Sequence, residues 1–415
     1  MKRFPKPCCC LILILFFSAF TLQAQQEDRI IGVSISGLKR TRLATAERYL
    51  EKFIGLEADT LDINEVWAAV LGTGILEPLS VQIDVLPSGE KILAVSVHEK
   101  WSIFPVPVLI LSSEGVSAGG AVYDANAFGM NDKLFLAGFY YSEGWLAAAG
   151  YIHESPVLGV PGWNIMANFS RAERHDRDQR REDLRRFDLD GISFRAGLNF
   201  RLLDNSGPLS AQVHASYAQK ILRNREEAVN GPEEGSRILG TGGGFSFEKS
   251  SWDGFLLSRE EASLQYAFHV PLEGSFFQSY RFRGVLEKSL VPGFRLVAKT
   301  GLLFQPGVPV LFESPPSAAQ VAILPLSFSA QNYAGLSAGL EKYLLKFSTG
   351  TLSVQASYQL VYSRSSVLGD SFDHGVAAMF SFYLSRLAIP AIGLGAAYNV
   401  KENFLQGSFS IGMTF

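Results

Sequence analysis

Two segments of the chain have the spacing of a hydrolase nucleophile. Residues 115–119 and 335–339 both read G-x-S-x-G, with Ser117 and Ser337 at their centres. In α/β-hydrolases this pattern holds the serine on a sharp strand–turn–helix bend, with acid and histidine partners. Here both serines lie in alternating segments rich in small residues, which are typical of strands. We therefore interpret both motifs as strand positions and expect no enzyme activity.

Metal and cofactor chemistry also lack a suitable pattern. No two histidines have metal-ligand spacing. The six histidines are His98, His153, His175, His214, His269 and His374. The only cysteines, at positions 8–10, lie near the start of the chain. The sequence thus predicts no metal site and no cofactor.

Residues 171–186 are the most strongly charged stretch, with seven arginines and five acids. One interpretation is a surface loop that meets lipopolysaccharide phosphates or a protein partner. The other is a solvated loop whose own charges compensate one another, and the near balance of signs favours it.

The N-terminus has the pattern of a secretory signal. Lys2, Arg3 and Lys6 precede an apolar core at residues 11–20, and Ala24 offers a small-residue cleavage site. We predict a signal peptide over residues 1–24, which would remove all three cysteines. No later segment approaches the ~18 consecutive apolar residues of a membrane-spanning helix.

The composition narrows the class of protein further. The chain is 47% hydrophobic, with 31 Phe, 14 Tyr and 39 Gly. Such a chain without a spanning helix is either a large soluble β protein or a β-barrel in lipid. The signal peptide and the period-2 alternation favour the barrel. The net charge of −3 leaves no basic face for phosphates, so nucleic acid is not an expected partner.

Residues 27–100 read as a small α+β domain of order β-α-α-β-β. A strand at 30–35 precedes a helical pattern at 43–53. A second helix begins at Asp62, three residues before Glu65, the spacing of a capping box. Strands at 79–86 and 92–97, joined by the turn Pro-Ser-Gly-Glu, close the unit.

Residues 104–415 consist of alternating segments of about ten residues, the length of a tilted membrane-spanning strand. We predict a 16-stranded antiparallel barrel. The sixteen segments start near residues 104, 115, 132, 145, 163, 187, 208, 237, 258, 276, 293, 333, 350, 373, 390 and 403. Because charges keep to one parity, Arg281, Arg283 and Glu341 are expected to face a water-filled lumen.

The last segment alternates Phe409, Ile411, Met413 and Phe415 with polar or small residues, as expected of a closing strand that ends on an aromatic residue. In the first segment, Pro105 and Pro107 cannot donate ladder hydrogen bonds. The seam between the first and last strands is therefore predicted to be weakly paired.

Connection lengths agree with this topology. The three longest, 173–186, 223–236 and 306–332, follow the fifth, seventh and eleventh segments. These segments are all odd-numbered, so the three connections lie on the same side of the barrel, as the long outer loops of such barrels do.

Several motifs occur in the order and spacing of a known superfamily. Residues 33–41 (VSISGLKRT) and 95–100 resemble the start and end of a POTRA domain. Residues 123–129 (YDANAFG) resemble a D-x-N-x-x-G turn, and residues 340–343 (LEKY) a Leu-Glu-Tyr strand. Trp252-Asp253-Gly254-Phe255 lies where a D-x-G turn joins the eighth and ninth strands. Nearly all of the mature chain resembles the superfamily of BamA, TamA and the two-partner secretion transporters.

This resemblance implies a Gram-negative outer-membrane protein with its N-terminal domain in the periplasm. It implies a role in inserting or translocating β-rich client polypeptides, captured at a POTRA edge strand. Outer-membrane lipid and lipopolysaccharide, and periplasmic chaperones or accessory lipoproteins, are further implied partners. The alternative is a passive channel or surface barrel derived from the same family.

One departure concerns the sixth outer loop. The family has a V-R-G-F/Y motif there, whose arginine bonds to acids of the barrel wall. The corresponding stretch here contains Val321, Ala322, Ile323 and Leu324 and has no arginine. The one Arg-Gly pair of the barrel, Arg283-Gly284, falls inside the tenth predicted strand. We expect the loop to fold inward through apolar contacts without the arginine, which favours the passive alternative.

Overall fold

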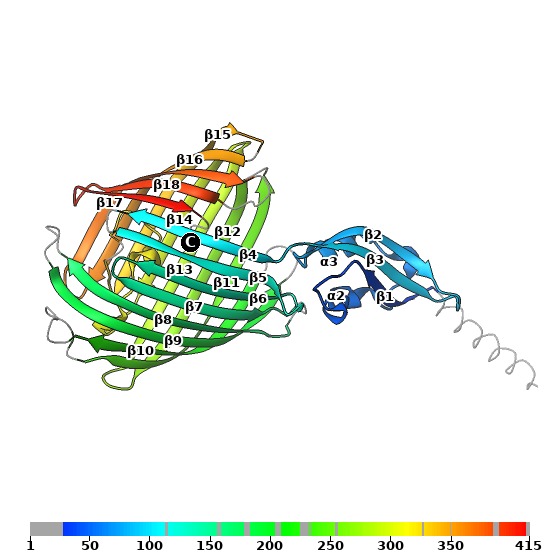
Figure 1. Ribbon diagram of the computed structural model, residues 1–415, viewed down its shortest axis with the longest axis horizontal. Helices are drawn as coiled ribbons and strands as arrows, with labels where there is room; N and C mark the ends of the chain where they lie inside the picture. Colours follow the sequence, from blue (N-terminus) through cyan, green and yellow to red (C-terminus); the bar gives the residue numbers. More distant parts are fainter. Residues whose placement is uncertain are drawn as a thin grey trace, which may run out of the picture. The chain divides into compact units, whose positions relative to one another are not determined.

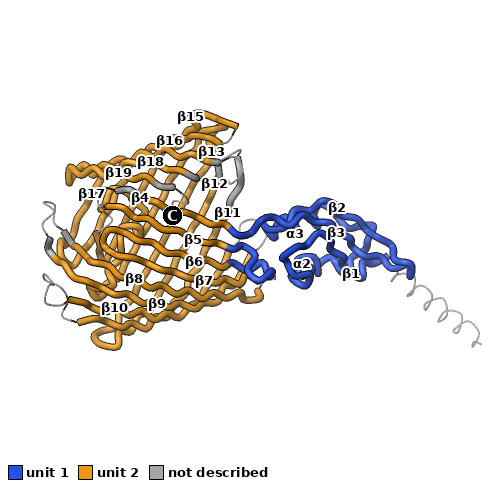
Figure 2. Tube along the Cα trace, in the orientation of Figure 1, with its two compact units in different colours: residues 1–103, 124–133 blue, residues 104–123, 134–415 orange. Residues whose placement is uncertain are grey.

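The computed structural model describes residues 28–112, 115–155, 159–177, 183–203, 209–224, 232, 234–253, 256–325, 328–348, 350–384 and 390–411. The predicted signal peptide lies outside these residues. The chain divides into two compact units (Figures 1 and 2). The first contains residues up to Ile103 together with Asp124–Lys133, and the second contains Phe104–Tyr123 and Leu134–Phe415.

The first unit is a three-stranded sheet with two helices. Strand β1 (Ile30–Ser36) pairs in parallel with β3 (Lys91–Glu99), and β2 (Leu76–Val85) pairs antiparallel with β3. The sheet order is β1-β3-β2, so β1 and β2 are its edges. Helices α2 (Leu43–Leu50) and α3 (Ile63–Leu71) and the short 3₁₀ helices η1 (Glu51–Phe53) and η2 (Ala58–Thr60) lie between β1 and β2. This order is the predicted one.

Local sequence explains the second helix and the core. The Asp62 carboxylate caps α3 by accepting the N–H of Asn64 at 2.9 Å, which satisfies one of the free donors of the first turn. The apolar faces of the helices and of the sheet then meet in one cluster. Its buried members are Ile30, Ala46, Leu50, Phe53, Ala58, Val66, Val70, Ile75, Leu76, Leu93, Val95 and Val97.

A buried carboxylate organises the end of β3. Glu99 is 6% exposed and accepts the backbone N–H groups of Lys39 (2.6 Å), Arg40 (2.9 Å) and Thr41 (3.1 Å), and the Asn126 side-chain amide at 3.2 Å. Burial opposes ionisation of Glu99, but these backbone donors outweigh it and hold the pKa of the carboxyl below its ordinary value. Asn126 belongs to the D-x-N-x-x-G turn noted in the sequence.

Substituting Glu99→Gln should accelerate hydrogen exchange at residues 39–41 about tenfold or more at neutral pH. The neutral amide has a single acceptor oxygen, and an unsatisfied buried donor costs about 1–3 kcal/mol. Since the folded pKa is lowered, the carboxylate stabilises fully above the ordinary pKa of about 4.3 and loses this effect as pH falls through the folded value. The two proteins should therefore converge in acid, as measured by exchange mass spectrometry on the full chain. Glu90→Gln, in the exposed β2–β3 turn, is the control. Equal protection in both variants at neutral pH would contradict the role of Glu99.

The second unit is a closed antiparallel barrel of sixteen strands within the described residues, β4 to β19 (Figure 1). Neighbouring strands are consecutive in sequence, and β19 pairs with β4 to close the sheet. The strands are β4 (Ile103–Ser112), β5 (Gly115–Ala127), β6 (Asp132–Tyr141), β7 (Gly144–His153), β8 (Gly162–Arg177), β9 (Asp183–Leu203), β10 (Leu209–Arg223), β11 (Ser236–Asp253), β12 (Leu256–Pro271), β13 (Phe277–Val291), β14 (Phe294–Phe304), β15 (Asn332–Lys346), β16 (Gly350–Ser365), β17 (Gly369–Leu384), β18 (Pro390–Asn399) and β19 (Phe404–Ile411).

The period-2 pattern sorts side chains between the two faces of the barrel wall. Along β16, Tyr358 and Tyr362 are exposed on the outer face, whereas Ser353 and Ser363 of the other parity are buried. This alternation confirms the predicted barrel and most of its strand starts.

Both G-x-S-x-G motifs lie inside strands, β5 and β15. No helix in the described part of the chain is long and apolar enough to span a membrane, and the described residues contain no group of metal-ligating side chains.

The predicted loop at 173–186 is wrong. Strand β8 continues to Arg177 and β9 begins at Asp183, so most of this charged stretch is a paired hairpin. Opposite charges support the pairing: Arg171 Nε lies 2.8 Å from Asp190, and Arg186 Nε lies 2.5 Å from Glu173. The self-compensating interpretation therefore holds for these pairs, but in strands rather than in a loop.

Candidate functional site: the lumen loop and the barrel seam

The connection between β14 and β15, residues 305–331, is here called the lumen loop. It contains two short 3₁₀ helices, η4 (Val310–Phe312) and η5 (Pro316–Ala319). Its described residues contact β8 and β9 as well as β18 and β19. Four strands, β4 to β7, lie between these two pairs around the wall. Because the barrel is closed, one loop can reach all of them only from inside. The side chains it touches therefore mark the lumen face.

One half of the loop packs against the lumen face of β14 to β18. Its buried residues Ala319, Ile323 and Leu324 join wall residues in an apolar cluster. The buried wall members are Leu303, Tyr333, Val361 and Ala397. Two glycines allow the close approach, since a Cβ would lie 2.3 Å from the Ala318 oxygen at Gly301 and 2.1 Å from the Ala319 oxygen at Gly335. The expected apolar, inward-folded loop is thus present.

The other half of the loop packs against a different arc of the wall. Leu311 and Phe312 contact an apolar cluster on β9 and β10. Phe312 also packs with Val308 against β11 and β13. The wall residues are Phe187, Leu189, Leu222, Ile238 and Phe277. Apolar contacts therefore hold the loop from both sides of the lumen.

A buried carboxylate of the loop binds two arginines of the wall. The Glu313 side chain has no exposed area, and its Oε2 accepts from Arg174 at 3.0 Å and from Arg185 at 3.4 Å. Its Oε1 accepts the backbone N–H of Ser366 at 3.0 Å. Arg174 also donates to the Val310 carbonyl at 2.9 Å. We call Glu313, Arg174 and Arg185 the Glu313 cluster.

The stretch aligned with the absent family motif is held through its backbone. Gln359 of β16 accepts the N–H of Ala322 at 2.7 Å, and Asn399 of β18 donates to the Ile323 carbonyl at 3.5 Å. Gln406 of β19 donates to the Leu324 carbonyl at 3.2 Å and also bonds the Ala322 carbonyl. Val321 packs at the edge of the apolar cluster. Since β19 is a seam strand, these bonds tie the loop to the seam.

Strands β4 and β19 form the seam at which the barrel closes. Within the described residues, β4 and β19 pair from Leu109 opposite Ile411 to Ser112 opposite Ser408. Phe409 lies within the seam, opposite Leu111, whereas Met413 and Phe415 lie outside the described residues.

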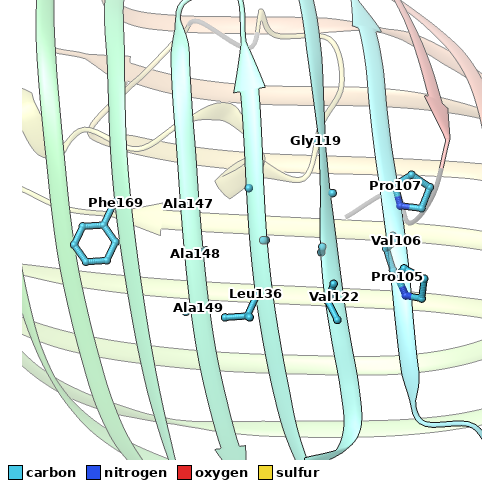
Figure 3. A pocket seen from close by; sticks show the side chains of 14 residues that line it. Pro105, Val106, Pro107, Gly119, Val122, Leu136, Ala147, Ala148, Ala149 and Phe169 are labelled. Atoms are coloured by element: carbon cyan, nitrogen blue, oxygen red, sulfur yellow. The ribbon is translucent and has the colours of Figure 1, made fainter.

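Pro105 and Pro107 lie in β4, before its described pairing with β19 at Leu109 to Ser112. They line one end of a shallow groove that crosses β5 to β7 and reaches Phe169 of β8 (Figure 3). Glycine and alanine form most of the groove, including Gly119, Ala147 and Ala149. In this groove, strands β5 to β7 therefore present mostly small side chains.

The predicted lumen charges fall into two groups. Glu341 is 1% exposed and accepts from Arg295 at 2.6 Å, from Ser353 at 2.6 Å and from Tyr383 at 3.1 Å. It is thus part of a satisfied buried network. Arg283 and Arg281 are exposed to the lumen. Among the described residues, Arg283 has a carboxylate in an ion pair, Glu261 at 3.4 Å, and Arg281 has none.

The comparisons with known proteins rest on structure, because no family model and no curated protein matches the sequence. BamA from Haemophilus ducreyi, solved without POTRA domains 1–3, superposes with a TM-score of 0.64 at 14% identity, over 93% of this chain and 84% of that one. CdiB from Acinetobacter baumannii gives 0.66 at 11% identity, over 94% and 74% of the two chains. CdiB from Escherichia coli gives 0.65 at 13%, over 93% and 76%.

The fold is that of BamA and CdiB. In this BamA-like barrel the loop contact has the opposite polarity to the one that the family resemblance implies. There an arginine of the loop would bond to acids of the wall, whereas here Glu313 of the loop bonds to wall arginines. The acid therefore lies on the loop and the arginines lie on the wall.

Sequence reasoning missed the whole Glu313 cluster and the three wall amides. One signal was available, because Glu313 is the only charged residue between positions 305 and 331. A single carboxylate in an otherwise uncharged loop is a candidate for a specific contact. Its arginine partners could not be chosen in the same way, since seven arginines compete in the stretch 171–186.

Proposed function

We propose that this chain is a Gram-negative outer-membrane protein that inserts or translocates β-rich client polypeptides, without an enzymatic step. The closed barrel with its apolar outer face suits a bilayer, in which only helices and closed barrels satisfy the backbone. The fold shared with BamA and CdiB supports an assembly or translocation role.

In this proposal the first unit is a POTRA-like domain in the periplasm. Its β2 strand is a sheet edge on which Leu79 is 63% exposed. An exposed edge can pair with an extended client segment by strand addition. Outer-membrane lipid, lipopolysaccharide and periplasmic chaperones or accessory lipoproteins would be the other partners.

The contact between the lumen loop and the seam strand β19 carries the proposal. The lumen loop contacts β19 through Gln406, which donates to the Leu324 carbonyl. Release of the loop would therefore free the seam strand and clear the lumen together. The client could then leave sideways through the seam or pass along the lumen.

A passive channel or surface barrel is the second candidate. The observation in its favour is the loop, which lacks the family's arginine motif and is held by the Glu313 cluster instead. A barrel whose loop stays seated needs no client, and the first unit would then be dispensable.

Reconstitution in liposomes separates the two. The purified mature protein should accelerate protease-resistant folding of an unfolded outer-membrane barrel relative to empty liposomes. Deleting residues 29–100 should abolish the acceleration if the first unit captures clients. No acceleration by the full chain, together with steady ion conductance in planar bilayers that survives the deletion, would instead establish the passive channel.

A further inference from the structure

The lumen face of β9 to β13 contains a group of basic side chains that the loop and the seam do not use. Arg195 lies on β9, His214 on β10, His269 on β12 and Arg281 on β13. We call these four residues the basic lumen patch. Between them, β11 presents glycines, of which Gly240 lies opposite both Ser216 of β10 and His269 of β12. A Cβ at Gly240 would lie 2.6 Å from Ser216 Oγ, so the glycine lets the neighbouring polar groups approach.

Contacts within the patch hold its rings in place. Arg195 Nη2 lies 3.0 Å from His214 Nδ1. His269 is stacked on Phe277 at a centroid distance of 4.6 Å, and its Nε2 lies 3.0 Å from Ser279 Oγ. These contacts fix the two histidines. Among the described residues, the Arg281 guanidinium has no hydrogen-bond or ion-pair partner and remains available to a ligand.

The charges of the patch are not compensated. Arg281 acts electrostatically on Arg195, and Arg195 and His269 act on His214. Among the described residues, no carboxylate acts appreciably on any of the four. Arginine cannot release its proton in proteins, so Arg195 on β9 and Arg281 on β13 are two permanent like charges that repel each other in this part of the lumen.

The neighbouring basic groups of the same lumen wall are built differently. Arg259 lies 3.6 Å from Glu261, Arg295 lies 3.4 Å from Glu287, and Lys299 lies 4.0 Å from the same Glu287. Arg283, two positions after Arg281 on the same face of β13, has Glu261 at 3.4 Å. Built-in acids thus compensate this group, whereas the patch lacks them.

We propose that the basic lumen patch binds a multivalent oxyanion, with Arg195 and Arg281 contacting its charged oxygens. Guanidinium groups present a planar fork of donors that matches carboxylate and phosphate oxygens. A bound anion would relieve the repulsion between the two arginines. The ligand class follows from the shared chemistry of phosphate and carboxylate groups, and the test distinguishes the two.

The test is calorimetric titration of the full-length protein in detergent, with tripolyphosphate in one arm and citrate in the other. The wild type should bind at one site, and Arg281→Gln should weaken binding about tenfold or more, since each hydrogen bond to a charged group is worth about 1.5–3 kcal/mol. Arg283→Gln is the matched control and should change affinity about twofold or less. Binding of tripolyphosphate alone would identify phosphate as the ligand group, and binding of both would identify charge as the determinant.

A second variant, Arg195→Gln, guards against misfolding of the first. Both should retain the wild-type circular dichroism melting curve, and either one that does so is sufficient for the test. Absence of binding of both anions by the wild type would overturn the proposal. Equal loss in Arg283→Gln and Arg281→Gln would also overturn it, because the effect would then be a general one of lumen charge.

Discussion

Substituting Glu313→Ala should release the lumen loop from the barrel wall. The carboxylate is fully buried and pairs with Arg174 and Arg185, and removing one partner of such a group costs about 3–5 kcal/mol because charges are left buried and unpaired. The released fraction of the loop should rise about a hundredfold or more. The measurement is the rate at which a maleimide labels Ala319→Cys, a buried loop position, in a protein that begins at residue 25 and so has no other cysteine.

Three variants in the same labelling background sharpen this result. Glu173→Ala removes an acid whose partner Arg186 is half exposed, and it should leave the labelling rate nearly unchanged. Gly335→Val should unseat the loop by an independent route, since its Cβ would collide with the Ala319 carbonyl. Gly138→Val, where a Cβ meets nothing within 4 Å, is the control for valine in a strand. Slow labelling in both Glu313→Ala and Gly335→Val would mean that these contacts do not seat the loop.

A disulfide across the seam should abolish insertion of client barrels if they leave sideways. Leu111 of β4 lies directly opposite Phe409 of β19, so cysteines there face the same side at the short separation that a disulfide needs. Oxidised Leu111→Cys/Phe409→Cys should fold clients at least about tenfold more slowly than the reduced protein, because a covalent bond cannot open on the timescale of insertion. The liposome folding assay, run with and without reductant, measures this.

In the matched control, the crosslink joins β16 and β17, two neighbouring strands that are not part of the seam. Tyr358 of β16 and Val376 of β17 are opposite each other on the outer face, and their cysteine pair should leave activity unchanged in both redox states. Full activity of the oxidised seam variant would show that clients do not pass between β4 and β19. The lumen would then be the remaining route, and the Glu313→Ala variant would be expected to increase transport.

The predicted elements that matched best are those set by local pattern. Alternation predicted a strand that starts near residue 350, and the structure has β16 at Gly350–Ser365. The Asp62 cap and the Pro-Ser-Gly-Glu turn likewise placed α3 and the β2–β3 hairpin. The clearest failure, residues 173–186, was one where local charge density suggested a loop. Pairing between strands reversed that choice, because an acid on one strand lies beside an arginine on the other.

The candidate site was predictable only in part. The stretch 321–324 was located correctly as an inward apolar segment from its position in the sixth outer loop, whereas the Glu313 cluster was not anticipated. Arg174 and Glu313 are 139 positions apart in the chain and meet only because the barrel closes. No period or spacing in the sequence records that meeting.

The inward loop was expected from the superfamily resemblance. The pattern of the sequence by itself determined the sixteen strands and the face of the wall on which their side chains lie. Those features depend on steric alternation and turn chemistry, which act between near neighbours. The tertiary structure alone decided which wall residues hold the loop and which of the described basic groups lack an acid. These depend on shear and closure of the sheet, which set distances between residues that the chain keeps far apart.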